Sequence, residues 1–274
     1  MLKQGSRAVV IFGAGASVEY GVPATIPLTD VIEQSICADP WMQRVGGDNA
    51  FQTIKNGLSA YLQKPGVVHF EQIYHCVHEL LHFYPPTIGS VDEFRPLLLP
   101  FLTNSSGLQK DALGSLERKI IEVIYTQVSS FCARPKCSLD QLGEFLTRLH
   151  ETHTTRIYST NYDDFLSQAV DGLFTGFEMS PGSCARFDGR QFLNQTNKHA
   201  LFHLHGSVHM AYGEMGVADI GELCWYRDRD EALKHSPFSG SGERRMDGSQ
   251  VARSPIITGL DKLSRIQQRP FCYY

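Results

Sequence analysis

Ala8-Val-Val-Ile-Phe12 and the turn that follows it, Gly13-Ala-Gly-Ala-Ser17, give the first indication of the fold. A short apolar, β-branched run that ends in a glycine turn is typical of the strand–turn–helix opening of a nucleotide-binding α/β unit. The glycines let the backbone approach a phosphate, and the amides at the helix start supply donors and the positive end of a dipole. A glycine turn can also simply connect two elements, so this segment alone leaves the function open.

The segment departs from the fingerprint of hydride-transfer dehydrogenases. Val18 stands where that fingerprint has its third glycine. A dehydrogenase should then show a second strand ending in a ribose-binding acid. Glu33 has the right spacing, but Leu28, Ile32 and Ile36 around it recur at helical spacing. The sequence therefore does not favour a dehydrogenase.

The rest of the chain predicts an α/β protein with a helical insertion. Amphipathic patterns predict helices over 67–84, 113–131 and 139–149, inside a helical module spanning about 27–150. Strand patterns resume at 155–159 and 200–204, and 254–258 is a further strand or an extended run. The expected organisation over 1–274 is a strand and glycine loop at 7–23, the helical module, and the remaining core at 154–274.

Polar residues follow three of the predicted strands, at 13–17, 160–163 and 205–206. In open α/β sheets, ligands bind outside the carboxyl ends of the strands. We therefore expect these three segments to converge on one site.

Composition narrows the class of protein. The chain has 274 residues, a formal net charge of −4, 42% hydrophobic and 20% charged residues. No apolar run reaches the ~18 residues of a membrane span, and the polar start of the chain lacks a secretory signal. The dispersed basic residues argue against duplex nucleic acid as a direct partner. These features predict a cytoplasmic protein without a membrane association.

Cysteines and histidines raise the question of a metal. The seven cysteines are odd in number and include no CxxC motif, so we interpret them as reduced thiols. His203 and His205, with His209 nearby, could ligate one ion from a strand face, and His75, His78 and His82 share one helix face. The alternatives are a core or orienting role for His203 and a polar surface or subunit contact for the helix. We expect no metal.

Three motifs together resemble those of the sirtuin superfamily. They are Gly13-Ala-Gly-Ala-Ser17 with Gly21-Val-Pro23, then Thr160-Asn-Tyr-Asp163, then His203-Leu-His-Gly206. Their order and their span of about 200 residues make the set more specific than any single loop. The resemblance is closer to the sirtuin-like domains of bacterial antiphage defence systems than to the protein deacylases. It implies a doubly wound, mostly parallel, Rossmann-like sheet that binds NAD, with a helical module beside it.

The chain departs from the deacylases at two points. Their zinc module needs four cysteines downstream of the catalytic His-Gly, but only Cys224 and Cys272 lie there. Their Gly-Ile-Pro is followed by Asp-Phe-Arg, whereas Pro23 is followed by Ala24-Thr25-Ile26. The resemblance also implies a further strand and glycine turn after Gly259, so we expect that the chain is truncated at its C-terminus.

The resemblance implies an NAD hydrolase that releases nicotinamide and ADP-ribose, with NAD as substrate. It assigns catalysis to Asn161, His205 and Asp163. It assigns NAD binding to Gly13, Ala14, Gly15, Ser17, Pro23, Thr160, Asn161, Asp163 and His205. Read as local structure alone, Asn161 and Asp163 could instead form a helix cap with an Asx turn.

Two other classes of function remain open. One is a zinc-free NAD-dependent deacylase or an ADP-ribosyltransferase, and the other is a module that senses NAD or ADP-ribose without cleaving it. Because unregulated NAD hydrolysis would kill the host, the resemblance also implies that the chain is an NAD-depleting effector whose activity is regulated. The expected partners are further copies of the chain, another defence protein or an appended domain.

Overall fold

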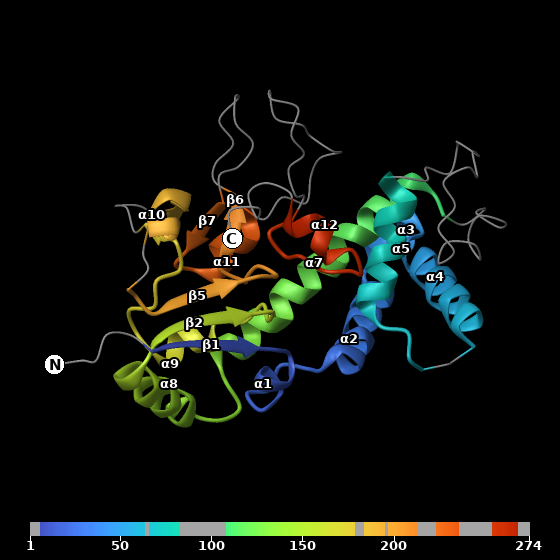
Figure 1. Cartoon of the computed structure of the whole chain (residues 1–274). Helices are drawn as coiled ribbons and strands as arrows, with labels where there is room; N and C mark the ends of the chain where they lie inside the picture. The colour runs from blue at the N-terminus through green and yellow to red at the C-terminus, as the bar shows by residue number, and fades with distance from the viewer. Residues whose placement is uncertain are drawn as a thin grey trace. The chain divides into compact units, whose positions relative to one another are not determined.

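The computed structural model describes residues 6–63, 66–82, 108–178, 184–194, 197–212, 223–235 and 254–267. The chain divides into two compact units, drawn in Figure 1. The sheet unit consists of Met1–Val22, Tyr125–Ile257 and Lys262–Tyr274, and the helical unit of Pro23–Ile124 and Thr258–Asp261. Helix α7 (Lys110–Ala133) contributes its first part to the helical unit and its second part to the sheet unit.

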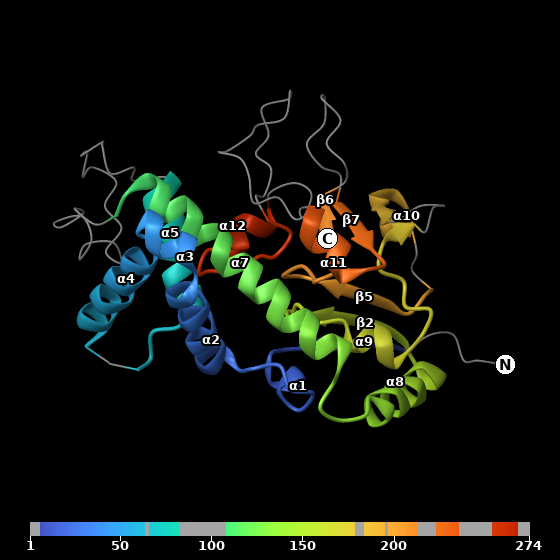
Figure 2. The ribbon, with the colours of Figure 1, turned by 180° about the vertical axis from the view of Figure 1, so that it is seen from behind.

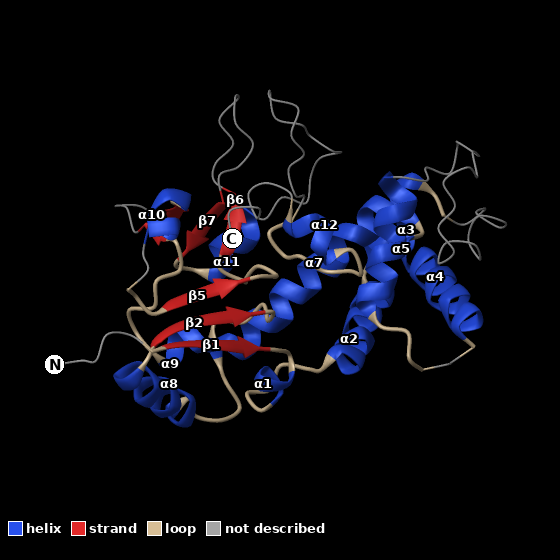
Figure 3. Cartoon of the chain, viewed as in Figure 1, coloured by secondary structure: helices blue, strands red, loops and turns tan. Residues whose placement is uncertain are grey.

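The sheet unit is built on three parallel strands in the order β1 (Arg7–Phe12), β2 (Thr154–Ser159), β5 (Ala200–His203). Phe12 pairs with Ser159, and Ser159 in turn with His203. The three strands therefore end side by side, as Figure 3 shows. This confirms the strands expected at 8–12, 155–159 and 200–204, and the α/β class with a parallel sheet.

Helices α8 (Asp140–Thr152) and α9 (Phe165–Ala169) belong to the sheet unit (Figure 2). Leu146 and Leu166 from these helices are buried with Ile157 and Leu201 of the strands. On strand β1, the alternate side chains Val9 and Ile11 are 66% and 74% exposed. A doubly wound sheet would cover both faces with helices, so that part of the expectation stays a prediction.

A second, antiparallel sheet was not expected from the sequence. It runs in the order β3 (Phe177–Glu178), β4 (Cys184–Phe187), β7 (Leu223–Tyr226), β6 (Met210–Tyr212). Its core contains Met210, Leu223 and Ile257, with Phe177, Phe187 and Trp225 packed against them. The sheet unit also contains α1 (Gly15–Val18), α10 (Gly189–Asn194), α11 (Arg229–His235) and α12 (Lys262–Ile266). Residues 254–258, expected as a strand or an extended run, form bends and no strand.

The helical unit contains α2 (Thr25–Ala38), α3 (Pro40–Val45), α4 (Gly47–Leu62), α5 (Phe70–His82) and the first part of α7. Its core is aliphatic and aromatic, with Ile32, Phe51, Ile54, Ile73 and Leu116 all fully buried. The helices expected over 113–131 and 139–149 are confirmed as α7 and α8. The helix expected over 67–84 is α5, and residues 83–84 lie outside the described residues. None of the helices in the described parts of the chain is long and apolar enough to cross a membrane.

Candidate functional site

Asn161 lies where the loops after β1 and β2 meet. The Thr160 amide donates to the Phe12 carbonyl at 3.0 Å, which continues the strand pairing into the loop. Asn161 Nδ2 then donates to the Gly13 carbonyl at 2.9 Å and to Ser17 Oγ at 2.6 Å. Because the Gly13 carbonyl only accepts, these contacts fix which side of the amide carries nitrogen. Asn161 Oδ1 is buried and has no hydrogen-bond partner among the described residues.

Ser17 links Asn161 to Asp163. Its hydroxyl accepts from Asn161 Nδ2 and donates to Asp163 Oδ2 at 2.5 Å. Asp163 Oδ1 accepts from the Phe165 amide at 3.3 Å, an Asx-type turn at the start of α9. Burial raises the pKa of Asp163 above its usual value, although the hydrogen bonds from Ser17 and Phe165 act in the opposite direction. Asp163 therefore takes part both in the local turn and in a polar chain that leads to Asn161.

His205 follows β5 and is half-buried. Its Nδ1 lies 2.9 Å from the Thr160 carbonyl oxygen. A carbonyl only accepts, so Nδ1 must carry a proton, and the lone pair of the neutral ring is then on Nε2. Gly206 has a φ of +82°, and a Cβ there would lie 1.7 Å from the Pro255 carbonyl oxygen. The chain can therefore turn here, directly after His205, only because residue 206 is glycine.

The structure brings most of the expected site residues together within the sheet unit. Hydrogen bonds connect Gly13, Ser17, Asn161 and Asp163, and a further bond joins Thr160 to His205. Ala14 and Gly15 form the start of α1, and a Cβ at Gly15 would meet no atom within 4 Å, which leaves room for a ligand beside the backbone. Pro23 belongs to the helical unit.

A buried polar cluster next to this site was not recognised in the sequence. Asp164 accepts from Gln168 Nε2, and its other oxygen lies 2.7 Å from His209 Nε2 and 3.6 Å from Arg229 Nε. From the sequence, we considered His209 only as a metal ligand, and we did not single out Asp164 or Arg229. The available signal was the consecutive pair Asp163-Asp164 after a strand, because two adjacent buried carboxylates need cations or hydrogen-bond donors.

His203 is buried at the end of β5, with its ring centroid 5.3 Å from that of Trp225. Burial lowers its pKa to about 4, and the neighbouring His209 adds to the effect. Neither ring nitrogen has a hydrogen-bond partner among the described residues. His203 is thus a neutral core histidine close to the polar cluster.

Within the described residues, no group of three or more histidines, cysteines, aspartates or glutamates is placed to hold a metal ion. His78 of α5 lies with Nδ1 2.7 Å from Glu117 Oε1 of α7. The side chain of His82, the third histidine of that face, lies outside the described residues. The expectation of no metal stays a prediction.

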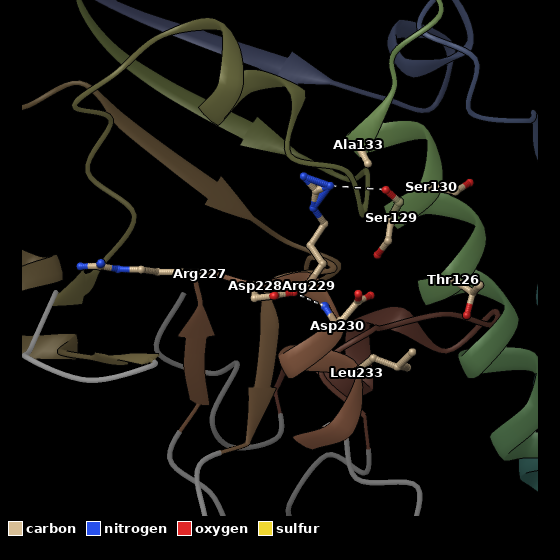
Figure 4. A pocket seen from close by; sticks show the side chains of 9 residues that line it. All are labelled: Thr126, Ser129, Ser130, Ala133, Arg227, Asp228, Arg229, Asp230 and Leu233. Atoms are coloured by element: carbon tan, nitrogen blue, oxygen red, sulfur yellow. Dashed lines mark hydrogen bonds between the residues drawn. The ribbon is translucent and has the colours of Figure 1, made fainter.

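A separate open pocket of about 650 Å³ lies in the sheet unit between α7 and the start of α11. The side chains around it are polar apart from Ala133 and Leu233, with Thr126, Ser129 and Ser130 on α7 and Arg227, Asp228, Arg229 and Asp230 opposite. In Figure 4, Arg229 reaches toward α7, where Nη1 donates to the Ser129 carbonyl at 3.4 Å, whereas Arg227 points away. The pocket contains none of the expected site residues, and Arg229 connects it to Asp164.

Comparison with protein families gives one match relevant to the site. The family described as a SIR2-like domain matches residues 155–221. The matched segment includes β2 from its second residue on, the loop with Asn161 and Asp163, and His205 after β5. A comparison with curated proteins finds no match. The match supports a relationship to the sirtuin superfamily and, broadly, an NAD-related activity.

Proposed function

We propose that the chain hydrolyses NAD at the bond between nicotinamide and ribose. The observation that carries the proposal is the hydrogen bonding of Asn161. Its amide nitrogen donates to Gly13 and Ser17, while its buried oxygen has no partner among the described residues. A buried acceptor of this kind calls for a donor from a ligand or a water molecule. A ribose hydroxyl or the attacking water is such a donor.

His205 supplies the second element of the chemistry. With Nδ1 bonded to the Thr160 carbonyl, the neutral ring offers Nε2 as a proton acceptor. The bond between ribose C1′ and nicotinamide breaks with its electron pair moving to the pyridinium nitrogen, so the leaving group needs no proton. The water oxygen bonds to C1′, and its proton passes to His205 Nε2.

Asp163 supplies the third element. Bond breaking develops positive charge on the ribose, as in glycoside hydrolysis. A carboxylate near the ribose stabilises that charge, and Ser17 holds one Asp163 oxygen in place. The proposed roles are therefore orientation of the ribose or water by Asn161, proton acceptance by His205, and charge stabilisation by Asp163.

The wider biological role belongs to the same proposal and rests on the resemblance of the three motifs. In this reading, the chain is a regulated NAD-depleting effector of antiphage defence and works with further copies of itself or with a partner protein. Glycine at residue 15 supports the NAD part of the reading, because the open space there lets a phosphate approach the backbone.

The test is incubation of the purified chain with NAD in the absence of any acylated peptide, followed by chromatography of the products. We expect free nicotinamide and ADP-ribose in equal amounts. Asn161→Ala should lower nicotinamide release by about 100-fold, the usual effect of losing one catalytic interaction. Asn56→Ala, a matched change at an exposed position of α4, should leave the rate unchanged.

The other outcomes identify the competing functions. Nicotinamide release that requires an acyl-lysine peptide would favour a deacylase, and transfer of ADP-ribose to protein would favour a transferase. Binding of NAD by calorimetry, without release of nicotinamide, would favour a sensing module. Each of these results would overturn the proposed hydrolysis.

A further inference from the structure

His209 lies between two hydrogen-bond acceptors in the interior of the sheet unit. Its Nε2 is 2.7 Å from Asp164 Oδ2, and its Nδ1 is 2.7 Å from the Tyr226 carbonyl oxygen. The carbonyl only accepts, so Nδ1 must donate. Whether Nε2 also donates depends on whether Asp164 is ionised.

The surroundings of Asp164 favour its ionised form. Burial alone would raise the pKa of Asp164, but the hydrogen bond and charge of His209, together with the Cys132 thiol and the Arg229 guanidinium, lower it well below its usual range. An ionised Asp164 cannot donate, so the hydrogen bond at Nε2 would then also be donated by His209. Acceptors at both ring nitrogens are the geometry that an imidazolium paired with a buried carboxylate needs.

The ring of His209 is held on its face as well as at its edges. It stacks on Trp225 with 4.9 Å between centroids and 7° between planes. The His209 carbonyl accepts from the Tyr226 amide at 2.8 Å, which ties the backbone to β7. Rotation of the ring would break both hydrogen bonds and the stacking contact at once.

Asp164 is equally fixed. Its Oδ1 accepts from Gln168 Nε2 at 2.7 Å, and the same Gln168 nitrogen donates to the Cys132 carbonyl of α7 at 2.9 Å. The charged and titratable groups facing the ion pair include Asp163 beside Asp164, Arg229 on α11, Cys132 on α7 and His203 on β5. The pair thus joins the start of α9 to β7 and α7.

This ion pair lies next to the residues of the proposed site. Asp164 directly follows Asp163 and is three residues after Asn161. The Tyr162 carbonyl accepts from the Val208 amide at 2.9 Å, just before His209. The loop is therefore anchored on either side of Asp163, by backbone at Tyr162 and by charge at Asp164.

We propose that His209 is a positioning residue, whose imidazolium holds Asp164 and thereby fixes the loop that presents Asn161 and Asp163 to the substrate. The proposal rests on the proposed function for the identity of the substrate, and on the ion pair alone for the positioning. A shift of about 1 Å in a catalytic group can cost 100-fold in rate, so an anchor of this kind acts on turnover more than on binding.

The first test measures the wild-type chain and uses a variant only to assign signals. Nitrogen-15 NMR of the wild-type chain, with the His209 signals assigned by loss in His209→Gln, reports whether each ring nitrogen carries a proton. We expect both His209 nitrogens to be protonated at neutral pH. A ring with one unprotonated nitrogen would overturn the ion pair and with it the proposal.

The second test separates positioning from general stability. His209→Gln removes the charge. His235→Gln is the matched control, because His235 also stacks on an aromatic ring of β7, that of Tyr226 at 5.0 Å, but lies outside the pair. We expect hydrogen exchange of residues 159–165 to increase in His209→Gln and not in His235→Gln. For nicotinamide release, kcat should fall by about 10-fold or more while KM changes by less than about 3-fold.

Removing one member of a buried pair can prevent folding. If His209→Gln does not fold, the double variant His209→Gln/Asp164→Asn removes both members of the pair and leaves only the partly exposed Arg229 without its carboxylate. It should show the same increase in exchange and the same fall in kcat. Unchanged exchange and unchanged kcat in a folded variant would overturn the proposal. If wild-type protein releases no nicotinamide, the proposed function fails, while the NMR and exchange results still decide the positioning.

Discussion

The two ends of the parallel sheet hold histidines in opposite chemical settings. At the carboxyl ends of the strands, His205 faces a carbonyl, and His209 faces a carbonyl and a carboxylate. At the amino ends, His150 of α8 and His199 before β5 stack at 3.9 Å with 19° between the rings, and His199 Nδ1 accepts from the Thr155 amide at 3.3 Å. Burial lowers the pKa of both amino-end histidines.

The difference shows that burial and hydrogen-bond partners together set what an imidazole does. Acceptors at the carboxyl ends keep protons on ring nitrogens, which suits proton transfer and ion pairing. At the amino ends, burial and, for His150, the neighbouring His199 ring favour the neutral form. We therefore expect changes of the carboxyl-end histidines to affect chemistry and changes of the amino-end histidines to affect stability.

The largest effect is expected at Gly206, in the turn after the last parallel strand. Gly206→Ala at the carboxyl end places a methyl group 1.7 Å from the Pro255 oxygen at a φ of +82°. Because backbone must move, we expect a loss of about 4 kcal/mol or more in the free energy of unfolding. Chemical denaturation measures this loss.

Gly172 provides the matched control for Gly206. It lies between α9 and the bridge from Phe174 to Ala200, at the amino end of β5, with a φ of +77° and no atom within 4 Å of an added Cβ. Gly172→Ala should lower the free energy of unfolding by only about 1 kcal/mol, which is the cost of placing alanine in a left-handed backbone conformation. Equal losses in the two variants would show that the contact with Pro255 does not constrain the turn after His205.

The next effect separates the histidines by function. His205→Ala removes the proposed proton acceptor, and nicotinamide release should fall by about 100-fold with the fold retained. His199→Ala removes a ring of similar exposure at the other end of the sheet and should change kcat by less than about 2-fold. Wild-type turnover by His205→Ala would remove His205 from the mechanism.

The parallel sheet could be predicted because its signals are local. The runs at 8–12, 155–159 and 200–204 are apolar and β-branched, and parallel pairing then brings their carboxyl ends together. That geometry predicted that the segments 13–17 and 160–163 would converge. Which atoms meet there, Asn161 Nδ2 with the Gly13 carbonyl and Ser17 Oγ, came from the structure.

The antiparallel sheet and the ion pair could not be predicted in the same way. Strands β3, β4, β6 and β7 are two to four residues long, too short to show a period of two. Asp164 and His209 are 45 residues apart, and nothing in their local sequence selects one as the partner of the other. Their pairing follows from where β6 and β7 place His209 against the loop after β2.

The smallest effect is the acid sensitivity of the amino-end pair. The unfolded chain takes up protons at histidine near pH ~6.5, whereas burial lowers the pKa of His150 and His199 in the folded state. The pair therefore contributes stability above pH ~6.5 that is lost as pH falls toward the lower pKa values of the folded state.

The variant His150→Phe tests this contribution. It keeps the stacking and removes one titrating ring, and His150 Nε2 has no hydrogen bond among the described residues that the change would remove. Between about pH 7 and pH 5, we expect this variant to lose on the order of 0.5 kcal/mol less unfolding free energy than the wild type, a small value because both rings are partly exposed. A variant that loses as much stability as the wild type would show that the stacked pair does not resist protonation, and the contrast between the two ends of the sheet would then rest on the carboxyl end alone.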